Sequence, residues 1–409
     1  MKHKHTILTG ATGTLGLELL PRLIHDDPGQ QVTLLLRGQS MAAMQRRFER
    51  VRRYAQAFWP GLDLASVQPV HGDLTAPQLG MPASTYRSLQ RQVTRIIHAA
   101  ALTKLDPPLE LARRTNVGGT ENVLKFAAGC VHLEQLAHVS TAFVAGDRQG
   151  IITENDLYCG QRFLNTYQQS KCEAERFVRS CMEILPIVVF RPGIIVGDSL
   201  DGHIAELDNI YLPLAHIAMG HLRQIPGRGA ALLDMMPVDY IAAAMIRLLN
   251  TGECAGTTYH LTAGVGNAVM ARHLVEAAIR HAGRDIHRKP VFTEDLASAT
   301  RQAPGISERH PALKRLGVFF AHLNQRQEFD DANARCDLGA FAEGRPQPDR
   351  FLPRVFEFCR ITQWGRRLDW ACPQSRIGKE DDHEMASRVE MADSFLDAGR
   401  AGFCHAGSA

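Results

Sequence analysis

A tyrosine and a lysine four residues apart occur in the segment NTYQQSK, residues 165–171. On a helix, this spacing places Tyr167 and Lys171 on the same face. A lysine ammonium beside a phenol favours the phenolate and lowers the pKa of the phenol, so we expect Tyr167 to exchange a proton near neutral pH. Thr141 ends a β-branched run earlier in the chain, where its hydroxyl could hydrogen-bond a substrate oxygen. The alternative for Ser140 and Thr141 is that one of them only caps the strand end.

Glycines recur every third residue in TGATGTLG, residues 9–16. Gly10 permits a tight turn, Gly13 lets a pyrophosphate approach the backbone, and Gly16 lets the next helix pack close to the strand. The N-terminus of that helix then faces the phosphates. Because the segment lies between a strand-like run and a helical pattern, it indicates dinucleotide binding; the alternative is an ordinary strand-to-helix turn. The expected contacts of this turn with the cofactor are Gly10, Thr12, Gly13, Thr14, Leu15 and Gly16.

The residue after the second strand-like run distinguishes NADPH from NADH. An acidic residue there would bind the ribose 2′-hydroxyl of NADH. This chain has Arg37 instead, and arginine suits a 2′-phosphate through bidentate charged hydrogen bonds. The sequence therefore favours NADPH (NADP+), with Arg47 on the following helical stretch as a second phosphate contact. A solvated basic helix face explains the other arginines of that stretch equally well; they are Arg46, Arg50, Arg52 and Arg53.

The ends of the third and fourth strand-like runs offer further contacts to the cofactor. Asp73, followed by Leu74, has a carboxylate that can accept a hydrogen bond from the adenine amine. The fourth run ends in small residues, which leave room for the backbone of the cofactor. These small residues are Ala99, Ala100 and Ala101.

The elements that must position these residues follow from the alternation of the chain. β-branched runs alternate with helical patterns over the first two thirds, which predicts a parallel sheet covered by helices on both faces. The expected strands are 6–9, 32–36, 67–71, 95–98, 136–140, 187–191 and 257–262. The expected helices include 15–24, 120–128 and 239–249.

Two segments depart from this alternation. Residues 197–235 contain a loop and an apolar helix around 210–219, and residues after 265 show helices and proline-rich turns without a clear sheet. We therefore predict an α/β fold: a Rossmann-type doubly wound parallel sheet with a smaller, mainly helical substrate-binding domain. The expected boundaries are 1–198 and 236–264 for the NADP-binding domain, and 199–235 and 265–372 for the substrate-binding domain. We expect 373–409 to be a flexible tail with one amphipathic helix near 385–396.

Composition and charge exclude several classes of protein. The 46 basic residues nearly balance the 43 acidic ones, for a formal charge of +3, which is too even for a protein built around a nucleic-acid backbone. No run reaches the roughly 18 apolar residues of a transmembrane helix, and the first residues lack the apolar core of a signal peptide, so we expect a cytoplasmic protein. The nine cysteines form no C-x-x-C pair and the histidines lack zinc spacing, so we expect no metal.

Taken together and in this order, the motifs resemble the extended type of the short-chain dehydrogenase/reductase superfamily over roughly residues 5–350. They are the glycine turn, Asp73, 116–120, Thr141, Tyr167 with Lys171, and 191–193. A narrower resemblance is to the thioester reductase and fatty acyl-CoA reductase branch, the male-sterility type of NAD-binding protein. Its motifs are 35–37, 140–142, 169–175, 191–199 and 236–240.

The chain also differs from relatives of this kind in two respects. Ala145 stands where sugar-nucleotide members carry a tyrosine. The chain has none of the adenylation and carrier domains often fused to thioester reductases, so we expect it to act as a free-standing partner.

The resemblance implies NADPH-dependent reduction of an acyl thioester, carried by coenzyme A or an acyl carrier protein, to the aldehyde and, with a second hydride, the alcohol. Thr141 and Tyr167 would hold the developing oxyanion, and Tyr167 would supply the proton. Lys171 would bond the nicotinamide ribose, and Asn116 either relays protons through water or braces the sheet. The resemblance also implies nicotinamide contacts at Pro192, Gly193 and Ile195.

Other functions fit the same sequence. An extended-type NAD(P)-dependent dehydrogenase or epimerase would act on a secondary alcohol, a steroid-like compound or a sugar nucleotide. A cofactor-sensing protein without activity is disfavoured, because a sensor need not keep a proton donor such as Tyr167. The apolar helix either lines an acyl pocket, through residues such as Leu214 and Ile217, or packs on the sheet domain. The oligomeric state stays open, a homodimer included.

Overall fold

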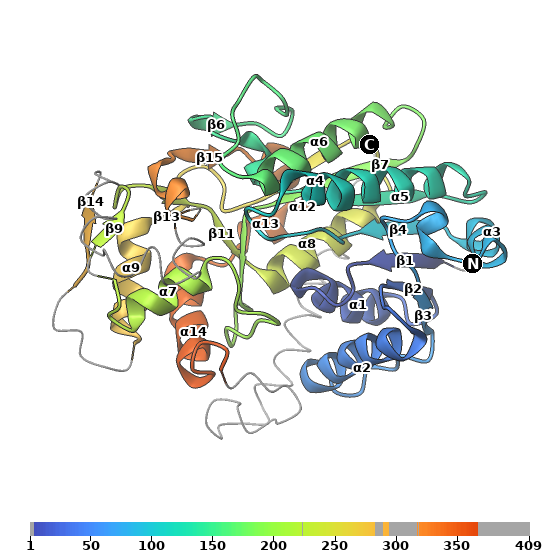
Figure 1. Cartoon of the computed structure of the whole chain (residues 1–409), viewed down its shortest axis with the longest axis horizontal. Coiled ribbons are helices and arrows are strands. Elements are labelled where there is room, and N and C mark those ends of the chain that lie inside the picture. Colours follow the sequence, from blue (N-terminus) through green and yellow to red (C-terminus); the bar gives the residue numbers. More distant parts are fainter. Residues whose placement is uncertain (1–3, 223, 283–288, 294–316, 318, 367–409) are drawn as a thin grey trace, which may run out of the picture.

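The computed structural model describes residues 4–222, 224–282, 289–293, 317 and 319–366. At its centre lies a seven-stranded parallel sheet in the order β12-β7-β5-β4-β1-β2-β3 (Figure 1). Its strands are β1 (His5–Thr9), β2 (Gln31–Leu36), β3 (Val67–His71), β4 (Arg95–His98), β5 (Gln135–Val139), β7 (Ile187–Pro192) and β12 (Thr258–Leu261). The α/β fold and all seven predicted strands are confirmed.

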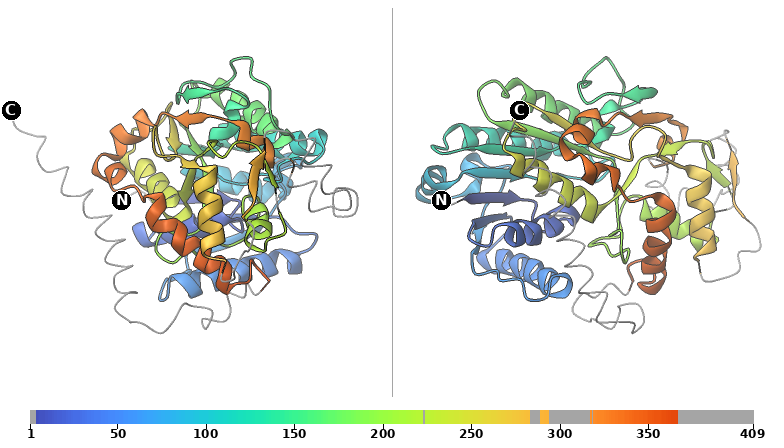
Figure 2. Two further views of the ribbon diagram at one scale, coloured as in Figure 1. Left: turned by 90° about the vertical axis from the view of Figure 1, so that its left-hand side faces the viewer. Right: turned by 180° about the vertical axis from the view of Figure 1, so that it is seen from behind.

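Helices cover both faces of this sheet (Figure 2). One face packs against α1 (Thr14–Asp26), α2 (Met41–Phe58) and α8 (Val238–Thr251), and the other packs against α3 (Ala83–Gln92), α5 (Gly119–Ala128) and α6 (Thr166–Ser180). The strand order reverses between β1, which follows the N-terminus, and β4, which lies beside it. A crevice for ligands is expected outside the carboxyl ends of the strands at such a reversal.

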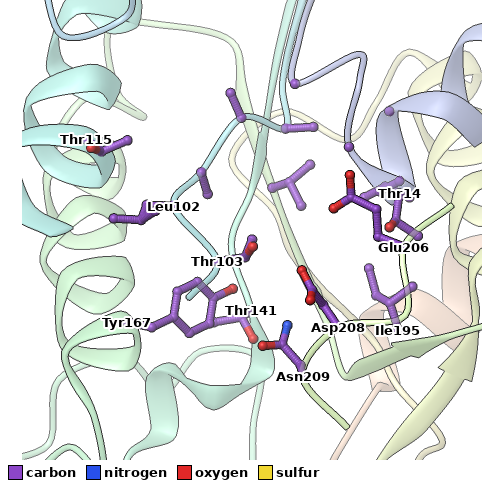
Figure 3. A pocket seen from close by; sticks show the side chains of 18 of the residues that line it. Thr14, Leu102, Thr103, Thr115, Thr141, Tyr167, Ile195, Glu206, Asp208 and Asn209 are labelled. Atoms are coloured by element: carbon purple, nitrogen blue, oxygen red, sulfur yellow. The ribbon is translucent and has the colours of Figure 1, made fainter. Parts of the chain in front are cut away.

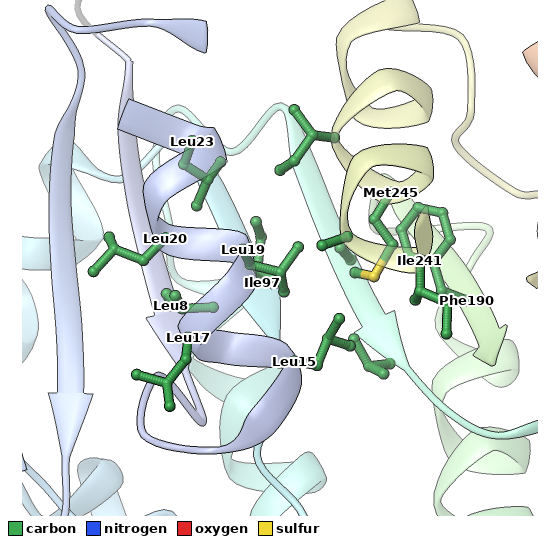
Figure 4. Packing of buried hydrophobic residues seen from close by; sticks show 14 of the residues in the cluster. Leu8, Leu15, Leu17, Leu19, Leu20, Leu23, Ile97, Phe190, Ile241 and Met245 are labelled. Atoms are coloured by element: carbon green, nitrogen blue, oxygen red, sulfur yellow. The ribbon is translucent and has the colours of Figure 1, made fainter. Parts of the chain in front are cut away.

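The strands are apolar on both sides because both sides are buried. Successive side chains of a strand point to opposite faces, and accordingly Ile7 and Leu8 of β1 belong to different buried clusters. Figure 4 shows the cluster on the Leu8 side, where α1 contributes Leu19 and α8 contributes Met245. This packing holds the glycine turn, which joins β1 to α1, against the centre of the sheet.

A second cluster of buried apolar side chains lies beside the sheet and gathers elements from distant segments. It includes residues of α7 (Tyr211–Ala218), α9 (Ala271–Arg280), η4 (Ala321–Asn324) and α14 (Pro348–Ile361). Helix α7 confirms the apolar helix predicted near 210–219. Whether the two clusters correspond to the predicted domain boundaries stays a prediction.

Four pairs of very short strands also occur. They are β8 (Ile194–Val196) with β11 (Met235–Pro237), β9 (Gln224–Pro226) with β14 (Val291–Thr293), β10 (Leu232–Leu233) with β13 (Val269–Met270), and β6 (Gly150–Ile152) with β15 (Gln327–Phe329). The expectation of no sheet after residue 265 is therefore wrong. Strands of two or three residues are too short to carry an alternating pattern, so only their partners in other segments reveal them.

The remaining short elements connect these parts. They are η1 (Pro77–Gly80), α4 (Leu109–Ala112), η2 (Arg113–Gly118), η3 (Ala142–Ala145), α12 (Ala332–Leu338) and α13 (Ala340–Glu343). Among the helices of the described residues, none is both long and apolar enough to cross a membrane. The predicted tail at 373–409, with its helix near 385–396, lies outside the described residues.

Candidate active site

A cavity of about 820 Å³ opens at the carboxyl ends of the sheet strands (Figure 3). Its lining comes from the segments that follow β1, β2, β3, β4, β5 and β7, from α6, and from residues near 204–211 and 319–322. Every predicted cofactor contact lines this one cavity, as do the predicted catalytic residues apart from Asn116.

The glycine turn forms the floor of one end of the cavity. Gly10 has a positive φ of 75°, a conformation that would strain any residue with a side chain. A Cβ at this position would also lie only 2.6 Å from the Ala100 backbone nitrogen, so there is no room for one. A Cβ on Gly16 would clash with the Gly10 carbonyl. Gly13 is different, because its Cβ would meet only the Gly10 oxygen, at 3.4 Å. Its open side, together with the uncapped N-terminus of α1, leaves backbone N–H groups for an anion.

Three arginines line the same end of the cavity: Arg37, Arg47 and Arg50. Arg50 forms an ion pair with Glu206 at 2.7 Å. Neither Arg37 nor Arg47 forms an ion pair with another described residue. The sequence left open whether the other arginines of α2 only form a solvated face; of these, Arg50 lines the cavity, and Arg46, Arg52 and Arg53 do not.

The residues at the ends of β3 and β4, which the sequence predicts as cofactor contacts, make local hydrogen bonds of their own. The Asp73 carboxylate accepts from the Thr75 backbone N–H and hydroxyl, each at 2.9 Å. The Ala100 N–H donates to the Thr9 hydroxyl at 3.2 Å. These bonds fix the conformation of the segments after β3 and β4. The same segments contribute Leu74, Ala99 and Ala101 to the cavity lining.

Thr141 and Tyr167 lie side by side at the other end (Figure 3). Thr141 caps η3 by accepting from the Phe143 N–H at 3.3 Å, and its hydroxyl lies 3.5 Å from the Pro192 carbonyl oxygen that it donates to. Burial raises the pKa of Tyr167 to about 12, and the neighbouring Thr141 hydroxyl opposes this rise. Tyr167 is therefore protonated at neutral pH in this structure.

Lys171 lies one helical turn further along α6, buried at 2% exposure. Its ammonium donates to the Val139 carbonyl at 2.8 Å. Burial lowers the pKa of Lys171 to about 8, opposed by the carboxylate of Glu175. The prediction that Lys171 lowers the pKa of Tyr167 is wrong for this structure, because desolvation of the phenol dominates and the ammonium is engaged with a backbone carbonyl.

A fully buried ion pair connects helix α6 to the central sheet. Glu175 and Arg191 approach to 2.6 Å with both side chains inaccessible to solvent. The Ser140 hydroxyl donates to the same carboxylate at 2.5 Å. The pair therefore joins α6 to β7 and to the end of β5, so Ser140 and Thr141 each have a structural bond.

Asn116 lies in the π-helical turn η2, and it is not part of the cavity lining. Its side-chain oxygen accepts from the Leu102 N–H at 2.7 Å, and its amide nitrogen donates to the Ser170 hydroxyl at 2.9 Å. Both bonds brace the segment after β4 against α6. These bonds are the kind that the bracing alternative expects, and the water relay stays a prediction.

Pro192, Gly193 and Ile195 line the cavity near Thr141. A Cβ on Gly193 would clash with the Asp234 carboxylate. That carboxylate accepts from the Ala263 N–H at 3.0 Å. Glycine is thus required here by packing beneath the cavity, independently of any ligand above it.

Several residues that line the cavity were not predicted from the sequence. They are Leu102, Thr103, Leu105, Leu111, Thr115, Phe143, Ile204, Glu206, Asp208, Asn209, Phe319 and His322. They lie in loops and short helical elements, so only the docking of distant segments reveals them. In the apolar helix, Leu214 and Ile217 are buried in the second cluster and do not line the cavity, whereas Ile210 and Tyr211 do. Leu214 and Ile217 are therefore core residues, but they pack with α9 and α14 in the second cluster and not on the sheet as the alternative had it.

Comparisons with known proteins agree with this architecture. The family described as male sterility protein, an NAD-binding family, matches residues 8–245. A linear gramicidin synthase of Brevibacillus parabrevis is 30% identical over 94% of this chain and 7% of its own length. Fatty acyl-CoA reductase wat of Drosophila melanogaster is 27% identical over 60% of this chain and 54% of its own length. The chain thus spans only part of these relatives.

Solved structures share the fold. The terminal R domain from the myxalamid PKS-NRPS biosynthetic pathway superposes with a TM-score of 0.75 at 25% identity, covering 90% of this chain and 92% of that one. A thiolation-reductase di-domain from an archaeal non-ribosomal peptide synthetase superposes with a TM-score of 0.70 at 20% identity, covering 90% of this chain and 77% of that one.

Proposed function

From the premise that the chain belongs to the male sterility protein family of NAD(P)-binding reductases, we propose that it is an NADPH-dependent reductase of an acyl thioester. The product is an aldehyde, and a second reduction would yield the alcohol. The observation that carries this proposal is the single cavity: a glycine turn with arginines lines one end, and Thr141, Tyr167 and Lys171 line the other.

The residues at the first end suit a dinucleotide with a 2′-phosphate. The open side of Gly13 and the uncapped N-terminus of α1 would receive the pyrophosphate. Arg37 and Arg47 would bind the 2′-phosphate, since neither is engaged by another described acidic group. When bound, NADPH supplies hydride to the thioester carbonyl carbon.

At the second end, the chain's own groups stabilise and protonate the oxygen of the substrate. Thr141 and Tyr167 would both donate to the carbonyl oxygen, where negative charge develops during reduction. The raised pKa of about 12 keeps Tyr167 protonated at neutral pH, as a proton donor requires. Lys171 would hold the ribose of the cofactor. Once the oxygen is protonated, the carbon–sulfur bond breaks, and the thiolate leaves with the bonding electrons as the hydroxyl proton is released.

Similarity to two kinds of relative supports a thioester substrate. One is named a fatty acyl-CoA reductase, and the other is a reductase domain solved together with a thiolation domain. We therefore propose coenzyme A or a carrier protein as the carrier of the acyl group. Within the segments 199–235 and 265–372, the described residues would belong to the substrate-binding domain.

The test is a turnover assay with purified protein. NADPH or NADH is mixed with a long-chain acyl-CoA, with the same acyl group on a carrier protein, and with a panel of ketones, and loss of reduced-nicotinamide absorbance is followed while aldehyde is trapped. The proposal expects NADPH consumption and aldehyde only with thioesters. Turnover of ketones without turnover of thioesters would instead support an extended-type dehydrogenase.

A further inference from the structure

His322 in the short helix η4 lines the cavity from its open side and is only 9% exposed. Its ring stands edge-on to Phe143, with centroids 5.5 Å apart, and its Nε2 lies 3.5 Å from the Asn165 amide nitrogen. Phe143 is two residues from Thr141, and Asn165 is two residues from Tyr167. His322 therefore borders the pair that would bind the substrate oxygen.

The hydrogen bonds of Asn165 determine which nitrogen of His322 carries the proton. Asn165 caps α6, because its Oδ1 accepts from the Gln168 N–H at 2.9 Å. The amide nitrogen of Asn165 is therefore the atom that approaches His322, and an amide nitrogen can only donate. Nε2 of His322 must accept, so the neutral ring carries its proton on Nδ1. Among the described residues, Nδ1 has no hydrogen-bond partner.

The surroundings keep this imidazole uncharged. Burial lowers the pKa of His322 to about 4, so the ring is neutral near pH 7. Two aromatic side chains flank it: Phe143, and Phe319, whose ring centroid is 6.4 Å away. A hydrogen-bond donor in an apolar wall is costly when it lacks an acceptor. His322 therefore offers an uncharged N–H group at a place in the cavity lining that two aromatic rings flank.

We propose that His322 is a specificity-determining residue, which donates its Nδ1–H to an amide carbonyl of the substrate. This inference rests on the proposed function, because it assumes that a thioester enters the cavity. An amide oxygen is the strong neutral acceptor that matches an uncharged donor, whereas a phosphate or carboxylate is better matched by a cation. A hydrocarbon chain would leave the N–H unpaired, and a site built to hydrogen-bond a substrate rejects analogues that lack the matching group.

An acyl thioester has two places for such a carbonyl. The acyl group has one when it is an aminoacyl or peptidyl group, and the pantetheine arm that carries the sulfur has others. The experiment therefore uses four thioesters: a straight-chain acyl group and an N-acylglycyl group of equal length, each on N-acetylcysteamine and on a simple alkanethiol of equal length. Wild type, His322→Leu and His322→Asn are compared by kcat/KM with NADPH.

His322→Leu removes one hydrogen bond to a buried donor. It should therefore lower kcat/KM by about tenfold on thioesters whose amide lies in the part that His322 contacts, either the acyl group or the thiol, and by less than about twofold on thioesters without that amide. His322→Asn, which keeps an N–H donor, should restore part of the rate on the same substrates. If the fall in kcat/KM occurs only when the acyl group carries an amide, the acyl group is the source of the carbonyl. If it occurs only when the thiol carries an amide, the pantetheine arm is the source.

A matched control is Phe143→Leu, which alters the same wall without removing a hydrogen-bonding group and should change all four substrates alike. NADPH affinity and melting temperature are measured for each variant. Equal loss on all four thioesters for His322→Leu, or no loss on any, overturns the role of His322 and leaves the proposed function intact. If wild type reduces none of the thioesters while binding NADPH, the proposed function fails and this inference fails with it.

Discussion

The two ends of the cavity are assembled in different ways. The end with the arginines comes largely from the first 50 residues: one glycine turn, the end of β2 and one face of α2. The open end, around Thr141 and Tyr167, takes its lining from the segments 102–105, 208–211 and 319–322, together with α6. A compact motif can position phosphate-binding groups locally, whereas a substrate wall depends on how distant segments pack.

The two ends also differ in solvation. Arg37 and Arg47 are exposed, so the first end keeps hydrated cations ready for a solvated phosphate. Lys171 and His322 are buried and Tyr167 is half-buried. Desolvation raises the pKa of Tyr167 and lowers the pKa of Lys171 and of His322, which in each case favours the uncharged form. Substitutions at the first end should therefore act on cofactor affinity, and substitutions of Tyr167 or His322 at the second end should act on chemistry. Lys171, which would hold the cofactor ribose, should affect both.

The largest effect should come from Tyr167→Phe. Loss of a general acid typically costs about 10²–10⁴-fold in rate, so turnover of the best thioester should nearly vanish. The change removes one hydroxyl and no phosphate contact, so NADPH affinity by fluorescence titration should stay within about twofold of wild type. A Tyr167→Phe variant with wild-type kcat would show that Tyr167 is not the proton donor. A loss of NADPH affinity in this variant would contradict the view that the two ends act separately on cofactor binding and on chemistry.

The second-largest effect should come from breaking the buried ion pair between Glu175 and Arg191, which supports α6. Glu175→Gln would leave Arg191 without its buried partner, and such a loss typically costs about 3–5 kcal/mol of folding stability. Because the pair joins α6 to β7, kcat should fall as well. The measurement is urea unfolding followed by fluorescence, with turnover assayed under conditions where the variant is folded.

A neighbouring residue of α6 provides the control for that variant. Glu173 pairs with Arg113 at 2.8 Å, but both side chains are partly exposed. Solvent screens such pairs, so Glu173→Gln should change the unfolding free energy far less than Glu175→Gln. Equal destabilisation by the two variants would contradict a special role for the buried pair.

The same contrast explains what could be read from the sequence. The seven sheet strands and the glycine turn were predictable, because β-branched runs and glycine spacing are local signals. His322 and Glu206 were not, because nothing near them in the chain indicates that they reach the cavity. The raised pKa of Tyr167 was also missed, because the spacing to Lys171 shows which residues share a helix face but not how deeply they are buried.

Arg37→Asp tests the cofactor end. Replacing a cation beside the expected 2′-phosphate by an anion should weaken NADPH binding by about tenfold to a hundredfold, since charge-assisted hydrogen bonds contribute roughly 1.5–3 kcal/mol. NADH affinity should rise or stay unchanged. Titration of both cofactors measures the ratio, and Arg46→Asp, on the same surface but outside the cavity lining, is the matched control. Equal affinities of native protein for NADPH and NADH would contradict the choice of cofactor.

Lys171 predicts a pH dependence of cofactor binding. Its pKa of about 8 means that the side chain is an ammonium below pH 8 and an amine above it. An anionic cofactor favours the ammonium, so NADPH affinity should fall as pH rises through about 8, by at most about tenfold per pH unit for one proton. Lys171→Met should bind more weakly at pH 7 and lose this pH dependence. An unchanged pH profile in Lys171→Met would assign the titration to another group.

The smallest effect distinguishes the lining of the open end from the core behind it. Ile210 and Leu214, one turn further along, are both packed in the second cluster, at 2% and 4% exposure, but only Ile210 also lines the cavity. Ile210→Trp should fill part of the cavity and shift the preferred acyl chain toward shorter lengths. The expected change in kcat/KM is about fivefold, the lower limit of the roughly 1–3 kcal/mol by which a pocket discriminates each methylene. Leu214→Trp overpacks the core, which typically costs about 1–3 kcal/mol, so it should lower the melting temperature with little change in the order of preferred chain lengths. NADPH affinity should be unchanged in both variants. If Leu214→Trp shifted the length profile and Ile210→Trp did not, the acyl chain would run behind α7 and the open end of the cavity would not be the substrate wall.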